Sequence, residues 1–208
     1  HPPTHEVESA ENTSWSCAHG VERWRRDCGC NFGQQPGWSQ AWRAPLRQAL
    51  DWLRDTLIPR YEEKAGQLLK DPWAARDDYI EVVLDRSRDR VERFLTKHTT
   101  RPLDQGEEIA VLKLLELQRH AMLMYTSCGW FFDDLAGIET VQVLRYAGRA
   151  ARLAKELFGE EVETTLLQIL QEAKSNLPEQ GDGCHIYERL VKPTVVDLAR
   201  VAAHYAVR

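Results

Sequence analysis

From Ser39 onward, apolar residues recur at three- to four-residue spacing almost without interruption, and this periodicity constrains the fold. No segment of the 208-residue chain alternates apolar and polar residues with the period of two that a half-buried strand requires. The sequence therefore predicts an all-α fold, a bundle of about five to seven helices. The first apolar stripe consists of Leu46, Ala49, Leu50, Leu53 and Leu57.

Residues 1–37 lack this periodicity and are rich in Gly, Pro, Ser and Asn. They nevertheless carry Trp15, Trp24 and Phe32, and aromatic residues are uncommon in disordered tails. We expect residues 1–37 to be a long irregular segment that continues from a missing upstream domain and packs against the helices. Residues 38–208 are expected to form the helical bundle domain.

Several residues predict where helices begin, bend and end. Pro59 is expected to kink or divide the first helix. The helix that starts at Pro72 is expected to run to Leu95 and to bury Ile80 and Leu84. The boundary signals are the cap and first-turn proline Asp71-Pro72, the capping-box pair Asp104 and Glu107, and Gly159 at a helix end.

Charge and composition exclude several classes of partner. The net charge is −5 and the isoelectric point is about 5.8, so no general attraction to nucleic acid or to an anionic membrane is expected. The sequence has no apolar run of 18 residues and no signal peptide at its start. An odd number of cysteines, five, without a secretory signal favours a reducing, cytoplasmic setting.

Two pairs of soft metal ligands lie within a dozen residues: Cys17 with His19, and Cys28 with Cys30. Zinc favours four tetrahedral Cys and His ligands. The C-x-H and C-x-C pairs are, however, tighter than the C-x₂-C pairs of common zinc motifs. The leading interpretation is that no metal binds and the thiols are free and buried beside a hydrogen-bonded histidine. A zinc site is the alternative.

The stretch Tyr125–Gly137 interrupts the helical pattern with three consecutive aromatic residues and two adjacent acids, Asp133 and Asp134. It can bind a polar ligand with ring faces, or it can be a helix connection in which Trp130 and its neighbours fill the core. Adjacent acids seldom face one bond from opposite sides, as glycoside hydrolysis requires. We interpret them as hydroxyl acceptors or as caps for the helix that starts near Ile138.

Two longer motifs resemble a known group of proteins. The segments 12–24 and 126–146 are similar to an uncharacterised helical domain that occurs C-terminal to glycoside hydrolase family 57-like catalytic domains in bacterial proteins. Thr13-Ser14-Trp15 and Ser127–Phe132 also resemble short elements of the family-57 amylase-like and branching enzymes themselves. Cys128-Gly129 departs from that family, which has Ser-Asp before the tryptophan.

The resemblance implies a C-terminal helical domain that packs on an upstream β/α-barrel and forms one wall of a cleft for an oligo- or polysaccharide, a glucan. Trp130, Trp24, His19 and Asp133 are the implied substrate-binding residues. The family's catalytic carboxylates lie on the barrel, so this chain is expected to contain no catalytic residue and to hydrolyse nothing alone. The other two hypotheses are a metal-stabilised interaction module and a purely structural bundle.

Overall fold

The computed structural model describes residues 5–6, 8–33, 35–196 and 198–207, and these residues form an all-α fold without a β-strand. This confirms the predicted fold class. Short 3-10 helices and one π-helical turn (Tyr187–Val191) join the longer elements. The α-helices are α1 (Arg43–Ala65), α2 (Pro72–Asp78), α3 (Ile80–Leu84), α4 (Arg88–His98), α5 (Gln105–Leu123), α6 (Cys128–Phe131), α7 (Ile138–Phe158), α8 (Glu163–Leu170), α9 (Gly183–Ile186) and α10 (Leu198–Val207).

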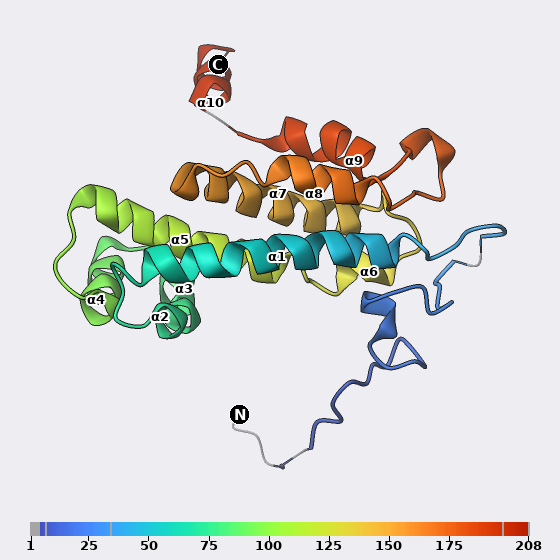
Figure 1. The fold of residues 1–208 in the computed structure, drawn as a ribbon, viewed down its shortest axis with the longest axis horizontal. Helices are drawn as coiled ribbons and strands as arrows, with labels where there is room; N and C mark the ends of the chain where they lie inside the picture. The colour runs from blue at the N-terminus through green and yellow to red at the C-terminus, as the bar shows by residue number, and fades with distance from the viewer. Residues whose placement is uncertain (1–4, 7, 34, 197, 208) are drawn as a thin grey trace.

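Helix α1 crosses the middle of the molecule (Figure 1). The N-terminal segment and α6 lie near its first turns, whereas α2, α3 and α4 lie near its last ones (Figure 1). Helices α5 and α7 pack along each other, and α8 packs on α1. No helix in the described part of the chain has the length and apolar content needed to cross a bilayer.

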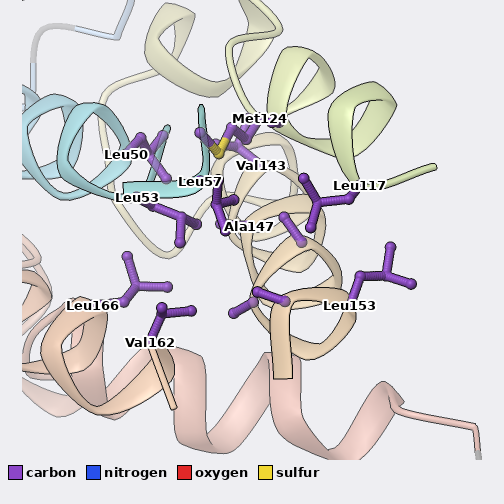
Figure 2. Close-up of a cluster of buried hydrophobic side chains, with 14 of the residues drawn as sticks. Leu50, Leu53, Leu57, Leu117, Met124, Val143, Ala147, Leu153, Val162 and Leu166 are labelled. Carbon is purple, nitrogen blue, oxygen red and sulfur yellow. The ribbon is translucent and has the colours of Figure 1, made fainter. Parts of the chain in front are cut away.

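The core lies where α1, α5, α7 and α8 meet. Figure 2 shows leucines of α1 pointing toward Val143 and Ala147 of α7 and toward Leu166 of α8. All five residues of the predicted stripe on α1 are buried, from Leu46 to Leu57. This burial supplies most of the driving force, because isolated helices of this size are only marginally stable in water.

The helix boundaries predicted from capping residues are confirmed. The Asp104 side chain accepts from the Glu107 backbone N–H, and the Glu107 side chain accepts from the Asp104 N–H, which completes the capping box of α5. Asp71 caps α2, with Pro72 in its first turn. Gly159 ends α7 with a φ of 72°, a left-handed conformation that favours glycine.

One prediction about the helices is narrowed and another is wrong. Of the two effects expected of Pro59, division of α1 does not occur, because the helix continues to Ala65. The expected helix from Pro72 to Leu95 is three helices, because the chain turns at Tyr79 and again at Asp85, whose carboxylate accepts from the Ser87 N–H. These turns place Ile80 and Leu84 on the surface, with exposed fractions of 55% and 80%.

The N-terminal segment has little regular structure of its own. Its 3-10 helix η1 (Glu22–Trp24) packs against α1 and α6. The rest consists of turns and extended stretches, as predicted for an irregular segment packed against the bundle. Residues 1–4, 7 and 34 of this segment lie outside the described residues, and the proposed division at residue 37 stays a prediction.

Candidate metal centre

The four metal-ligand residues of the N-terminal segment converge at one point. Among the described residues, one potential ligand atom from each of Cys17, His19, Cys28 and Cys30 lies within 4.8 Å of every other. Two local pairs with eight residues between them thus form one compact set. Cys17 is buried, Cys28 and Cys30 are half-buried, and His19 is exposed.

Two of the distances between these atoms lie close to the edges of a zinc tetrahedron, and a third is somewhat longer. Zinc–sulfur bonds of about 2.3 Å and zinc–nitrogen bonds of about 2.0 Å place two sulfurs about 3.8 Å apart and a sulfur and a nitrogen about 3.5 Å apart. The Sγ atoms of Cys17 and Cys28 are 3.7 Å apart. His19 Nδ1 lies 3.6 Å from the Sγ of Cys30 and 4.0 Å from that of Cys17. The residues present therefore fit a metal ion.

Turns directly after the ligands bring the two pairs together. Gly20 adopts a φ of 70° and donates its N–H to the Cys17 carbonyl at 3.1 Å. A Cβ at Gly20 would lie 2.4 Å from the Asn12 carbonyl oxygen, so only glycine fits there. Gly29, between the second pair of ligands, has a φ of 76°. These two glycines are the sequence signal that points to a folded ligand loop.

Backbone N–H groups also point at the sulfurs. Burial raises the pKa of the Cys17 thiol. Hydrogen bonds from the N–H groups of His19 and Arg23, together with those to the Cys28 and Cys30 side chains, outweigh it and lower the pKa to about 7. The pKa of the Cys28 thiol is raised, because the effect of burial is larger than that of the hydrogen bond from the Cys30 N–H, which lowers it. Hydrogen bonds of this kind stabilise thiolates, and the thiolate is the form of cysteine that binds metals.

Two buried arginines fix the ligand loop on the bundle. Arg43 of α1 donates from Nη1 to the Cys30 carbonyl at 2.7 Å and from Nη2 to the Phe132 carbonyl at 3.4 Å. Arg23 of η1 donates to the Phe131 carbonyl at 3.5 Å, and its guanidinium lies 5.0 Å from the centre of the Phe131 ring. Periodicity alone did not reveal either residue as part of the site.

An aromatic patch borders the metal ligands and consists of Trp15, Phe32, Phe131 and Phe132. The Phe131 ring lies 6.0 Å from Trp15, 5.5 Å from Phe32 and 5.3 Å from Phe132, measured between ring centres. The rings are inclined to one another by 43° to 80°. Trp15 is 93% exposed and Phe32 is 65% exposed, so ring faces are open to solvent.

The structure separates the predicted substrate-binding residues. Trp130 is 1% exposed, and its Nε1 donates to the Arg43 carbonyl at 3.4 Å. Asp133 is also buried, and its carboxylate accepts from the N–H groups of Phe32 and Gly33. Neither side chain is open to a ligand in this conformation, and their role in substrate binding stays a prediction.

Trp24 and His19 lie at the surface instead. Trp24 is half-buried and donates from Nε1 to the Ser127 carbonyl at 2.9 Å. His19 is exposed beside the three cysteines. The structure thus groups His19 with the metal ligands, and it uses Trp24 to join η1 to the residue before α6.

The adjacent acids are expected to accept from hydroxyl groups or to cap α7, and the capping alternative is wrong. Gly137 precedes α7, and no side chain caps that helix end. Asp134 accepts from the Ala136 N–H, the Ser175 hydroxyl and the Asn176 N–H instead. The two acids therefore bind different segments: Asp133 binds the N-terminal segment and Asp134 binds the loop after α8.

Comparison with known proteins identifies the helical part of the chain. Searches among curated proteins and among solved structures gave no match. The family model described as "Domain of unknown function (DUF3536)" matches residues 38–208, which include α1 to α10. The chain therefore belongs to the DUF3536 family.

Proposed function

We propose that Cys17, His19, Cys28 and Cys30 bind a zinc ion that stabilises the N-terminal segment of this helical domain. The observation that carries the proposal is the mutual distance of at most 4.8 Å among the four ligand atoms. Three cysteines and one histidine form a common closed structural site for zinc. A zinc thiolate centre also suits the reducing, cytoplasmic setting that we propose for the chain.

The buried charges around the ligands support this proposal. Arg23 and Arg43 are 3% and 0% exposed, and the Nε of each is buried without a hydrogen-bond acceptor. The negative charges that act on Arg43 are those of the Cys28 thiolate, the buried Asp133 and the exposed Asp27. Asp134 hydrogen-bonds to the loop after α8 instead. Uncompensated buried charges are costly. A zinc ion with three thiolates carries a net charge of −1, which would compensate the second arginine.

Metal analysis of the purified chain tests the zinc site. We expect about one zinc ion per chain, and loss of most of it in Cys30→Ser. Cys128→Ser is the matched control, because Cys128 is exposed and lies outside the ligand cluster. A folded chain without stoichiometric metal, even after incubation with zinc, would refute the zinc proposal.

As a second function, we propose that the domain forms one wall of a glucan-binding cleft in a glycoside hydrolase family 57-like protein, together with an upstream β/α-barrel. The resemblance of segments 12–24 and 126–146 to the helical domains of such proteins motivates this. The exposure of Trp15 and Phe32 favours it, because sugar rings present apolar C–H faces to aromatic side chains. In this proposal the aromatic patch contacts the sugar, while buried Trp130 belongs to the core and hydrogen-bonds to the Arg43 carbonyl.

Oligosaccharide binding by the chain tests the second function. We expect maltoheptaose to bind in calorimetric titrations and Trp15→Ala to weaken that binding. Leu84→Ala is the matched control, because Leu84 is 80% exposed and lies on α3, away from α6 (Figure 1). Equal binding by Trp15→Ala and the unchanged chain would rule out the aromatic patch as the sugar site.

A further inference from the structure

We propose that metal binding positions Trp15 and thereby completes the aromatic patch, so that the chain binds a neutral oligosaccharide in a metal-dependent way without any metal–sugar contact. This inference rests on the two proposed functions and adds a coupling between them. It concerns the regulation and the ligand chemistry of the patch.

The positions of the rings along the chain link them to the ligands. Trp15 precedes Cys17 by two residues, and Phe32 follows Cys30 by two residues. A chain of two residues spans at most about 7 Å, so fixing a ligand also restricts the ring beside it. Each exposed ring of the N-terminal segment therefore lies close to a metal ligand along the chain.

The bundle holds the two rings very differently. Phe32 is fixed directly, because its own N–H and that of Gly33 donate to the buried Asp133 carboxylate. Cys30, beside it, is held by Arg43. Phe32 therefore stays on Phe131 without a metal.

Trp15 depends on Cys17 for its position. The hydrogen bonds around it are local, from Thr13 to the Ala10 carbonyl and between Ser14 and Ser16. Its ring contact is with Phe131 at 6.0 Å between centres. The Sγ atoms of Cys17 and Cys28 are 3.7 Å apart. A metal bound to both sulfurs would therefore hold the residues around Trp15 against the later part of the N-terminal segment, which Arg43 and Asp133 already hold on the bundle. The structure thus predicts that metal loss releases Trp15 but not Phe32.

The residues beside the exposed rings indicate the ligand. Trp15 lies between Ser14 and Ser16, and Phe32 lies between Asn31 and Gly33. These neighbours are uncharged. The Ser14 and Ser16 hydroxyls hydrogen-bond to each other, and a hydroxyl can make more than one hydrogen bond, so they can also bind sugar hydroxyls. The inclined rings offer separate faces rather than one flat stack. Alternating apolar faces and hydroxyl rims are the chemistry of a neutral oligosaccharide.

Binding linkage gives the test. If the metal strengthens sugar binding by a given factor, the sugar must strengthen metal binding by the same factor. Maltoheptaose and cellohexaose are titrated into the zinc-loaded chain, the chelator-stripped chain and the re-loaded chain. We expect stripping to weaken binding by about tenfold or more and re-loading to restore it. Zinc should bind more tightly in the presence of the sugar.

Hydrogen exchange and the Trp15→Ala variant test the coupling separately from the two proposed functions. On stripping, amides 13–19 should exchange faster, while amides 32–33 and those of α1 keep their protection. Trp15→Ala should keep its zinc and bind sugar weakly whether metal is present or not. If the chain binds zinc and sugar, but binds the sugar equally well with and without zinc, only the proposed coupling is overturned. If the chain binds no zinc, the coupling and the proposed zinc site are both overturned. If it binds neither maltoheptaose nor cellohexaose, the coupling and the proposed glucan-binding function are both overturned.

Discussion

Arg43 donates a hydrogen bond of 2.7 Å from its Nη1 to the carbonyl oxygen of Cys30, and this contact joins α1 to the candidate metal centre. The Arg43 side chain is fully buried. Burial is the largest cause that lowers the pKa of its guanidinium, and repulsion from the charge of Arg23 lowers that pKa further. A buried cation therefore supports the ligand loop from the bundle side.

Arg43→Met should weaken both the fold and the metal site. It leaves the Cys30 carbonyl without its donor, which costs about 1–3 kcal/mol of unfolding free energy. It also removes a positive charge beside the thiolates. Urea unfolding and zinc competition with a chromophoric chelator measure the two effects. Arg88→Met is the control, since the Arg88 side chain is 90% exposed, and an equal effect of both variants would contradict the role of Arg43.

Trp130→Ala and Trp15→Ala should differ sharply in stability. Trp130 is fully buried, so its removal should cost about 3–5 kcal/mol of unfolding free energy. Trp15 is 93% exposed, so its removal should change that free energy by no more than about 0.5 kcal/mol. Urea unfolding followed by circular dichroism compares them. A stable Trp130→Ala chain would show that the central tryptophan is not a core residue.

Much of the fold follows from local patterns, and this explains which predictions succeed. The stripe on α1, the capping box of α5 and the Gly159 stop depend on residues close in sequence. The breaks at Tyr79 and Asp85 were missed because the apolar spacing continues across them. Ile80 and Leu84 fit a helical stripe, but which side of α3 meets the core depends on long-range packing.

The candidate site was predictable only in part. The ligand types of Cys17, His19, Cys28 and Cys30 are visible in the sequence, whereas their convergence is not. This convergence requires the turn at Gly20 and the attachment of η1 to α1 and α6. The contacts of η1 with α6 and with the residue before it join residues more than a hundred positions apart, such as Trp24 and Ser127.

Gly129→Ala should destabilise the contact between α6 and α7. A Cβ at Gly129 would lie 2.5 Å from Val143 Cγ2, which is closer than such atoms approach. Overpacking of this kind costs about 1–3 kcal/mol of unfolding free energy. Val143→Ala removes the opposing methyl groups, so the double variant should lose less stability than the two single variants together. Additive effects in urea unfolding would contradict this close approach.

His120 should make the fold less stable in acid. Burial lowers the pKa of its imidazole, which lies 2.7 Å from the Glu116 carbonyl through Nδ1 and packs edge-on to Tyr146. The unfolded chain therefore binds this proton at a higher pH than the folded chain does. Below the ordinary histidine pKa, protonation favours unfolding, and the unfolding free energy falls as the pH falls.

His120→Gln should reduce that pH dependence. Urea unfolding at about pH 7 and about pH 5.5 should show a smaller loss of unfolding free energy in the variant than in the unchanged chain. His204→Gln serves as the control, because His204 is exposed on α10. If both variants lose as much stability as the unchanged chain, burial of His120 does not govern the acid response.

Loss of the metal should expose the loop between the two ligand pairs to trypsin. Arg25 and Arg26 lie in this loop with side chains 57% and 68% exposed, and their ion pairs with Glu22 are weak surface interactions. Trypsin needs a locally extended chain, and a metal that joins Cys17 to Cys30 resists that opening. Cys30→Ser should therefore be cut after Arg25 or Arg26 faster than Cys128→Ser.

Arg88 provides an internal control. Its side chain is more exposed than those of Arg25 and Arg26, but it lies in α4, so cleavage after Arg88 should stay slow in both variants. Equal cleavage of the loop in the two variants would show that the segment is held by its contacts with Arg43 and Asp133 alone.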